Sequence, residues 1–136
     1  MRDFSRGAEW LSINQATTRP QWSLEQAIAG YARNGVRGIA VWRDKLAELG
    51  VKEAARLIRD NGLTVTGLCR GGMFPAADKA SRQAALDDNR RAVDEAAALG
   101  APALCFVVGG LPAGGKDLAA ARARVSPASR SGSHQR

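Results

Sequence analysis

Apolar residues recur at three- and four-residue steps along residues 86–99, and charged side chains mostly fall between them. This spacing predicts a helix with one buried and one solvated face. Gly100 can end the helix in a left-handed conformation, and Pro102 prevents its continuation. Residues 103–108 are then apolar at every position, which is typical of a strand covered on both faces in a parallel sheet.

Three earlier segments show the same alternation of strand and helix. A first strand is expected at residues 10–16, followed by a helix that begins with Ser23 and Gln26 at the spacing of a capping box. Residues 38–42 predict a second strand and residues 63–69 a third, with one helix between them. Because a helix connects each strand to the next, neighbouring strands are expected to be parallel.

Four strands with about four helices predict an α/β fold of parallel βα repeats, either an open sheet or a barrel. The 136 residues are fewer than the roughly 250 of a complete (β/α)₈ barrel. Residues 1–9 are interpreted as a lead-in, residues 10–125 as the folded domain and residues 126–136 as a disordered basic tail. The last apolar stripe stops near Val125, which suggests a truncation or a change of reading frame.

The net charge of +7 is concentrated near the end of the chain, with +4 in residues 116–136. The other residues carry an ordinary balance, so nucleic acid is not expected as a partner. No apolar run is long enough for a membrane span, and the first ten residues lack a signal peptide core, which favours a cytoplasmic location. Cys69 and Cys105 fall in predicted strands and are expected to be buried thiols.

Polar side chains follow three of the predicted strands. Asn14 lies near the end of the first, Trp42 and Arg43 end the second, and Arg70 follows the third. Carboxyl ends of parallel strands share one rim, so these side chains are candidates for binding an oxyanion, a phosphate or sugar hydroxyl groups. The alternative is that the arginines pair with acids such as Asp44 and that Trp42 belongs to the core.

Residues 110–117 (GLPAGGKD) nearly match the phosphate-binding loop G-x-x-x-x-G-K-[ST]. The candidate phosphate ligands are Gly110, Gly115 and Lys116. Asp117 replaces the hydroxyl group that would hold Mg²⁺, and Pro112 lacks a backbone N–H, so a flexible loop is the favoured interpretation. His134 is the only histidine and lies in the predicted tail, so no metal site is assigned.

Five segments of the chain carry a resemblance to a known family. They are residues 11–14 (LSIN), 38–43 (GIAVWR), 67–74 (GLCRGGMF), 89–101 (NRRAVDEAAALGA) and 107–110 (VVGG). Together they resemble the N-terminal half of the sugar phosphate isomerase/epimerase family, over about residues 11–125. These enzymes are xylose isomerase-like (β/α)₈ TIM barrels, a superfamily that includes the endonuclease IV type.

The resemblance implies proton transfer next to a carbonyl of a ketose or aldose. In the family a divalent Mn, Mg or Zn ion stabilises the enediolate, and its ligands come from strands five to eight, so none is assigned here. The resemblance also implies substrate contacts at Asn14, Trp42, Arg43 and Arg70. We expect this chain to be inactive alone and its strand edges to bind a second copy or a complementary half-barrel. The alternative is a non-catalytic module that binds a sugar phosphate or nucleotide at residues 109–116.

Overall fold

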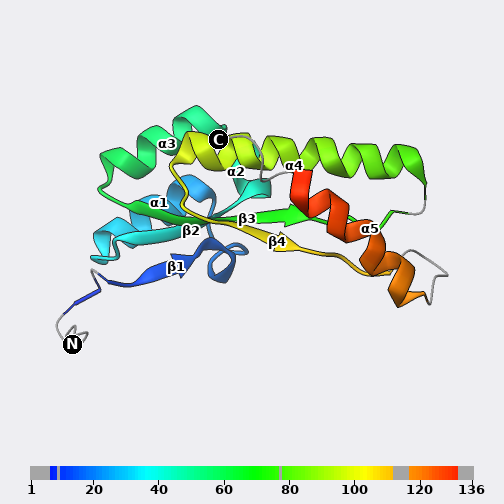
Figure 1. Cartoon of the computed structure of the whole chain (residues 1–136). Helices are drawn as coiled ribbons and strands as arrows, with labels where there is room; N and C mark the ends of the chain where they lie inside the picture. Colours follow the sequence, from blue (N-terminus) through cyan, green and yellow to red (C-terminus); the bar gives the residue numbers. More distant parts are fainter. Residues whose placement is uncertain (1–6, 9, 77, 112–116, 132–136) are drawn as a thin grey trace. The chain divides into compact units, whose positions relative to one another are not determined.

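The computed structural model describes residues 7–8, 10–76, 78–111 and 117–131 (Figure 1). The chain forms two compact units. Unit 1 comprises Met1–Cys69 and Glu95–Leu104, and unit 2 comprises Arg70–Asp94 and Cys105–Arg136. Each unit is therefore built from two separate stretches of the sequence.

Four parallel strands pair in the order β1-β2-β3-β4, which confirms the predicted α/β class. Their bounds are β1 Ser12–Asn14, β2 Gly38–Trp42, β3 Thr64–Gly72 and β4 Leu104–Val107. Ser12 pairs with Gly38 in β2, and the β2 to β3 register shifts between Ile39 and Ala40. β3 extends three residues beyond its predicted end at Cys69, and directly after it the Met73 N–H donates to the Val107 carbonyl of β4.

Five α-helices and one 3-10 helix accompany the strands in the described residues. They are η1 Gln15–Thr17, α1 Leu24–Arg33, α2 Arg43–Leu49, α3 Val51–Asp60, α4 Lys79–Leu99 and α5 Leu118–Ser131. The predicted capping box at Ser23 and Gln26 is present, with both reciprocal hydrogen bonds formed. Gly100 has a φ of 65°, as its predicted position after α4 requires.

Several element boundaries differ from the sequence prediction. The single helix expected after β2 is divided into α2 and α3 at Gly50, whose φ of 89° favours glycine. The first strand ends at Asn14, because η1 begins at the next residue. α5 runs to Ser131 rather than ending near Val125.

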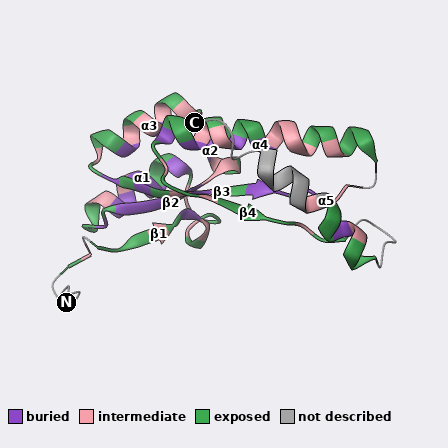
Figure 2. Ribbon diagram, in the orientation of Figure 1, coloured by how far each residue is buried: buried purple, intermediate pink, exposed green. Residues whose placement is uncertain are grey.

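The core of unit 1 forms between its helices and β2, on which Ile39 and Val41 are fully buried (Figure 2). In Figure 1, α1, α2 and α3 lie on the same side of β1 and β2. The buried core side chains come from α1, α2, α3, β2, β3, α4 and the segments just before β2 and β3, whereas β1 supplies none. They are Leu24, Ala27, Ile28, Tyr31, Val36, Ile39, Val41, Leu46, Ala54, Ile58, Leu63, Val65, Leu68, Ala96 and Leu99.

β4 is not covered on both faces as its apolar sequence predicts. Cys105, Phe106 and Val107 are exposed, and Figure 2 shows this strand as mostly exposed. The expectation of buried thiols is therefore wrong for Cys105, while Cys69 is half-buried. The physical reason is that burial of a strand face depends on the elements packed over it, which a continuous apolar run does not specify. β4 also stands at the end of the sheet, with a neighbouring strand on one side only. Within the described ranges, no helix is both long and apolar enough to cross a membrane.

The start of α4 is predicted to depend on pH through Asp78, which lies just before the helix. The backbone N–H and hydroxyl of Ser81 donate to the Asp78 carboxylate at 2.8 and 2.7 Å, and these bonds lower the pKa of Asp78. A lowered folded pKa stabilises the helix start above the ordinary value of 3.8, and the effect is lost as pH falls through the folded pKa. We expect the Ser81 amide to become less protected from hydrogen exchange in acid, relative to amides in the middle of α4. Asp78→Asn should remove this pH dependence, and an unchanged dependence would contradict the assignment.

Candidate functional site

Asn14 and Trp42 meet at the carboxyl ends of the neighbouring strands β1 and β2. Trp42 Nε1 donates a hydrogen bond to Asn14 Oδ1 at 2.6 Å. The same oxygen accepts from the backbone N–H of Ala16 at 3.1 Å and caps η1. Among the described residues, Asn14 Nδ2 has no hydrogen-bond partner. The pair therefore fixes an indole ring beside an amide group that can donate hydrogen bonds to a ligand.

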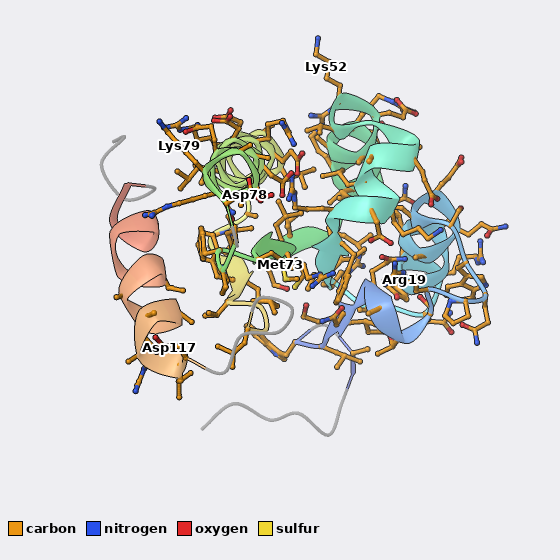
Figure 3. The ribbon with its side chains drawn as sticks, turned by 90° about the vertical axis from the view of Figure 1, so that its right-hand side faces the viewer. Arg19, Lys52, Met73, Asp78, Lys79 and Asp117 are labelled. Carbon is orange, nitrogen blue, oxygen red and sulfur yellow. The ribbon has the colours of Figure 1, made fainter. Side chains whose placement is uncertain are left out.

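Arg19 adds a positive charge to this pair. It lies between η1 and α1, where Figure 3 labels it, and its guanidinium carbon is 5.4 Å from the centroid of a Trp42 ring. Asp44 pairs with Arg19, and the two side chains are 44% and 41% exposed. Such an exposed ion pair is weak, so the guanidinium group can exchange this partner for a ligand anion. Sequence analysis overlooked Arg19, although its place in the first strand-to-helix loop was a signal.

Arg43 is turned toward Glu95 in unit 1. Its Nε and Nη2 donate to Glu95 Oε2 and Oε1 at 2.5 and 3.2 Å. The two side chains are 15% and 24% exposed, so this two-point ion pair is well shielded from solvent. Arg43 thus follows the alternative interpretation, in which the arginines pair with acids. Its partner is Glu95 and not Asp44. A substrate contact at Arg43 stays a prediction.

Gln15 is a polar residue of the site region that sequence analysis placed within a strand. Its side chain is fully buried, and neither Oε1 nor Nε2 has a hydrogen-bond partner within the described part of the chain. An unsatisfied buried amide is costly, because both polar atoms have lost the hydrogen bonds that water makes to them in the unfolded chain. The sequence carried no signal for this, because burial of Gln15 follows from the turn of η1 after Asn14.

We predict that Gln15→Met stabilises the chain, because an apolar side chain of similar size removes the cost of the unsatisfied amide. The expected gain is about 1–3 kcal/mol in the free energy of unfolding, measured by urea denaturation. Gln21→Met, at an exposed position before α1, is the matched control and should change stability by less than about 0.5 kcal/mol. A loss of stability in Gln15→Met would show that hydrogen bonds already satisfy the amide.

Arg70 lies in unit 2, in the last part of β3. Its Nη1 donates to the sulfur of Met73 at 3.5 Å. Met73 has a φ of 58°, which is rare for a residue other than glycine, and Figure 3 labels it just after β3. Backbone strain of this kind is typical of ligand-binding loops. The role of Arg70 as a substrate contact stays a prediction.

Asn89 of α4 anchors the end of β3 within unit 2. Its Oδ1 accepts from the Gly72 N–H at 2.5 Å, and its Nδ2 donates to the carbonyls of Gly72 and Ala85 at 2.8 and 2.7 Å. A Cβ on Gly71 would lie 2.8 Å from Asn89 Oδ1, and one on Gly72 would overlap the Val107 carbonyl. Asn89 is buried, but its hydrogen bonds to another element were not visible in the sequence.

We predict that Asn89→Leu destabilises the chain by about 1–3 kcal/mol, because the N–H and C=O of Gly72 lose a buried partner. Urea denaturation measures the loss, and hydrogen exchange should show an unprotected Gly72 amide. The control is Gln83→Leu at an exposed position of the same helix, which should change stability by less than about 0.5 kcal/mol. Equal stability of the Asn89 variant and the control would contradict the proposed anchor.

A pocket of about 380 Å³ lies in unit 2, beside the carboxyl end of β4. Its lining is apolar except for backbone groups and Arg122. The lining residues are Pro75, Val108, Gly109, Gly110, Leu111, Leu118, Ala121, Arg122 and Val125. Gly110 of the predicted phosphate loop is among them, whereas Gly115, Lys116 and His134 lie outside the described residues. The phosphate-loop hypothesis therefore stays a prediction.

The residues present do not fit the divalent metal that the family resemblance implies. In the described ranges, no group of three or more histidine, cysteine, aspartate or glutamate side chains could hold a metal ion. Glu95 and Asp44 are each engaged by an arginine. We therefore derive no chemical step through a metal bound to these residues.

Comparison with known proteins establishes the family. The model of the xylose isomerase-like TIM barrel family matches residues 28–130, so the chain belongs to this family. The crystal structure of protein SMc04130 from Sinorhizobium meliloti 1021 is 50% identical over 92% of this chain, with a TM-score of 0.84. The chain spans about half of that protein, 48% of its length.

A more distant structure shares the fold. A xylose isomerase domain containing protein from Salmonella typhimurium LT2 is 18% identical over 68% of this chain and 34% of its own, with a TM-score of 0.52. No curated protein is significantly similar to the chain. The resemblance to xylose isomerase-like barrels inferred from the sequence is thus confirmed.

Proposed function

We propose that the chain supplies substrate-binding residues to an isomerase or epimerase that acts on a sugar or sugar phosphate. The observation that carries this proposal is the 2.6 Å hydrogen bond between Trp42 and Asn14 at the carboxyl ends of β1 and β2. Membership of the xylose isomerase-like family supports it, because such barrels bind their substrates at this end of the strands.

The chemistry of a sugar matches the groups that Asn14 and Trp42 present. A sugar offers hydroxyl groups that accept hydrogen bonds, and Asn14 Nδ2 is a donor held in place by the two bonds to Oδ1. The ring faces of a sugar also carry C–H groups, and a half-buried indole such as Trp42 can pack against them. One side chain thus orients a hydroxyl group while the other contributes apolar contact.

Arg19 would distinguish a sugar phosphate from a free sugar. Its guanidinium group is exposed and has planar donors that suit a phosphate. A phosphate near Arg19 would compete with Asp44 for those donors. We therefore propose that the phosphorylated substrate binds more tightly than the free sugar and that Arg19 accounts for the difference.

Transfer of a proton next to a carbonyl requires an acid, a base and a group that stabilises the enediolate. We assign none of these roles to Asn14, Trp42 or Arg19, because amide, indole and guanidinium groups are poor proton carriers at neutral pH. Their proposed role is to bind and orient the substrate.

Calorimetric titration of the chain with ketoses, aldoses and their phosphates tests this proposal. Asn14→Ala should weaken binding about tenfold, which corresponds to the loss of roughly one good hydrogen bond. Trp42→Phe should also weaken it. The matched control is Asn34→Ala, because Asn34 lies after α1 and leads into the opposite end of β2.

Arg19→Met should lower the affinity for sugar phosphates alone, with Arg37→Met at the amino end of β2 as its control. The proposal fails if no sugar or sugar phosphate binds, or if Asn14→Ala and its control bind equally well. Equal loss of free sugar and sugar phosphate binding in Arg19→Met would contradict the phosphate assignment.

A further inference from the structure

The 380 Å³ pocket of unit 2 is separate from the sugar contacts proposed above, because Asn14, Trp42 and Arg19 belong to unit 1. Three segments of unit 2 line this pocket: the residues after β3, the residues after β4, and helix α5, which Figure 1 shows beside the end of β4. Its volume falls within the range of about 300–1,000 Å³ that is typical of small-molecule sites. The pocket is therefore large enough for a ligand of its own.

Two of these segments are held together by backbone contacts. After β3, the N–H of Phe74 donates a hydrogen bond to the carbonyl of Val108 at 3.1 Å. Gly109 has a φ of 97°, and a Cβ at this position would lie 3.3 Å from Cδ of Pro75. Glycine thus allows the two segments to approach closely, and together they form one wall of the pocket.

Helix α5 forms another wall. Asp117, labelled in Figure 3, accepts a hydrogen bond at Oδ1 from the backbone N–H of Ala120 at 2.9 Å, and this bond caps the start of the helix. Ala121 is 6% exposed, whereas Leu118 is 60% exposed. The helix therefore packs against unit 2 at Ala121 and leaves apolar surface open to solvent at Leu118.

The lining of the pocket carries one charged side chain, that of Arg122. None of the ion pairs formed among the described residues involves Arg122. The other lining side chains are apolar, and Val108, Leu111 and Leu118 are exposed although all three are large hydrophobic residues. Exposed apolar side chains around a hollow are typical of binding sites. A complementary ligand has an apolar body and one negative charge.

We propose that this pocket binds an amphiphilic carboxylate, with its apolar chain against Val108, Leu111 and Leu118 and its carboxylate on the guanidinium group of Arg122. A carboxylate matches the planar pair of N–H donors of a guanidinium group, and binding of the chain removes apolar surface from water. A sugar fits poorly, because the lining side chains other than Arg122 offer no hydrogen bonds to its hydroxyl groups.

Calorimetric titration of the 136-residue chain with octanoate tests the proposal. We expect octanoate to bind below its micellar concentration. Octanol has the same chain without the charge, and it should bind about fivefold more weakly, which is the effect of roughly one charge-assisted hydrogen bond at an exposed position. Octylammonium carries the opposite charge and should not bind.

Two variants separate the charged contact from the apolar one. Arg122→Met should reduce the affinity for octanoate to that for octanol and leave octanol binding unchanged. Leu118→Asn should weaken the binding of both, because it removes apolar contact. Both positions are exposed, so circular dichroism should show unchanged folding. The matched control is Arg90→Met on α4, also exposed and in unit 2, which should bind octanoate as the wild type does.

The test is independent of the proposed sugar site, because Asn14→Ala should leave octanoate binding unchanged. Absence of octanoate binding would overturn the proposal, and so would an affinity that Arg122→Met does not change. Equal binding of octanoate, octanol and octylammonium would show non-specific adsorption to apolar surface and would also overturn it. Flotation with phosphatidylcholine vesicles that contain oleate separates a free acid from a membrane: binding to vesicles without binding of octanoate would assign the surface to a membrane instead.

Discussion

Parallel pairing of β2 between β1 and β3 is the constraint on which the rest of the structure depends. Parallel strands cannot be joined by a short turn, so a helix must return the chain before each new strand can pair. The strand-to-helix connections therefore collect at the carboxyl ends of the strands. Asn14 and Trp42, separated by 28 positions in the sequence, meet there because of this geometry.

Helix α4 contributes one polar anchor to each unit. In unit 1, Glu95 holds Arg43 at the point where β2 passes into α2. In unit 2, Asn89 satisfies both backbone groups of Gly72, so its side chain replaces a neighbouring strand at the end of β3. In both units a helical side chain fixes the end of a strand. Polar groups thus position the rim residues, while apolar contacts stabilise the elements that carry them.

The sequence predicted those features that depend on local chemistry. The bounds of β2 were correct, because apolar residues on both faces of a strand give a continuous pattern. The capping box at Ser23 and the left-handed Gly100 were also correct, since each is encoded within a few residues. The order of the elements and the family resemblance followed from these local signals.

Features that depend on distant contacts were not predictable in the same way. The division of α2 from α3 at Gly50 involves no capping side chain, so only the glycine itself could have indicated it. The exposure of β4 depends on which distant elements pack over its faces, and the partners of Arg19 and Arg43 lie 25 and 52 positions away. Of the candidate site, the positions of Asn14 and Trp42 were therefore predictable, whereas the ion pairs around them were not.

The two anchors of α4 also differ in the order in which a folding chain can form them. The Asn89 anchor closes a loop between positions 17 apart, whereas the Arg43 anchor joins positions 52 apart. Closing the longer loop costs about 1 kcal/mol more chain entropy, by the logarithmic dependence on loop length. Loop entropy thus favours closure of the contact at Gly72 before closure of the contact at Arg43.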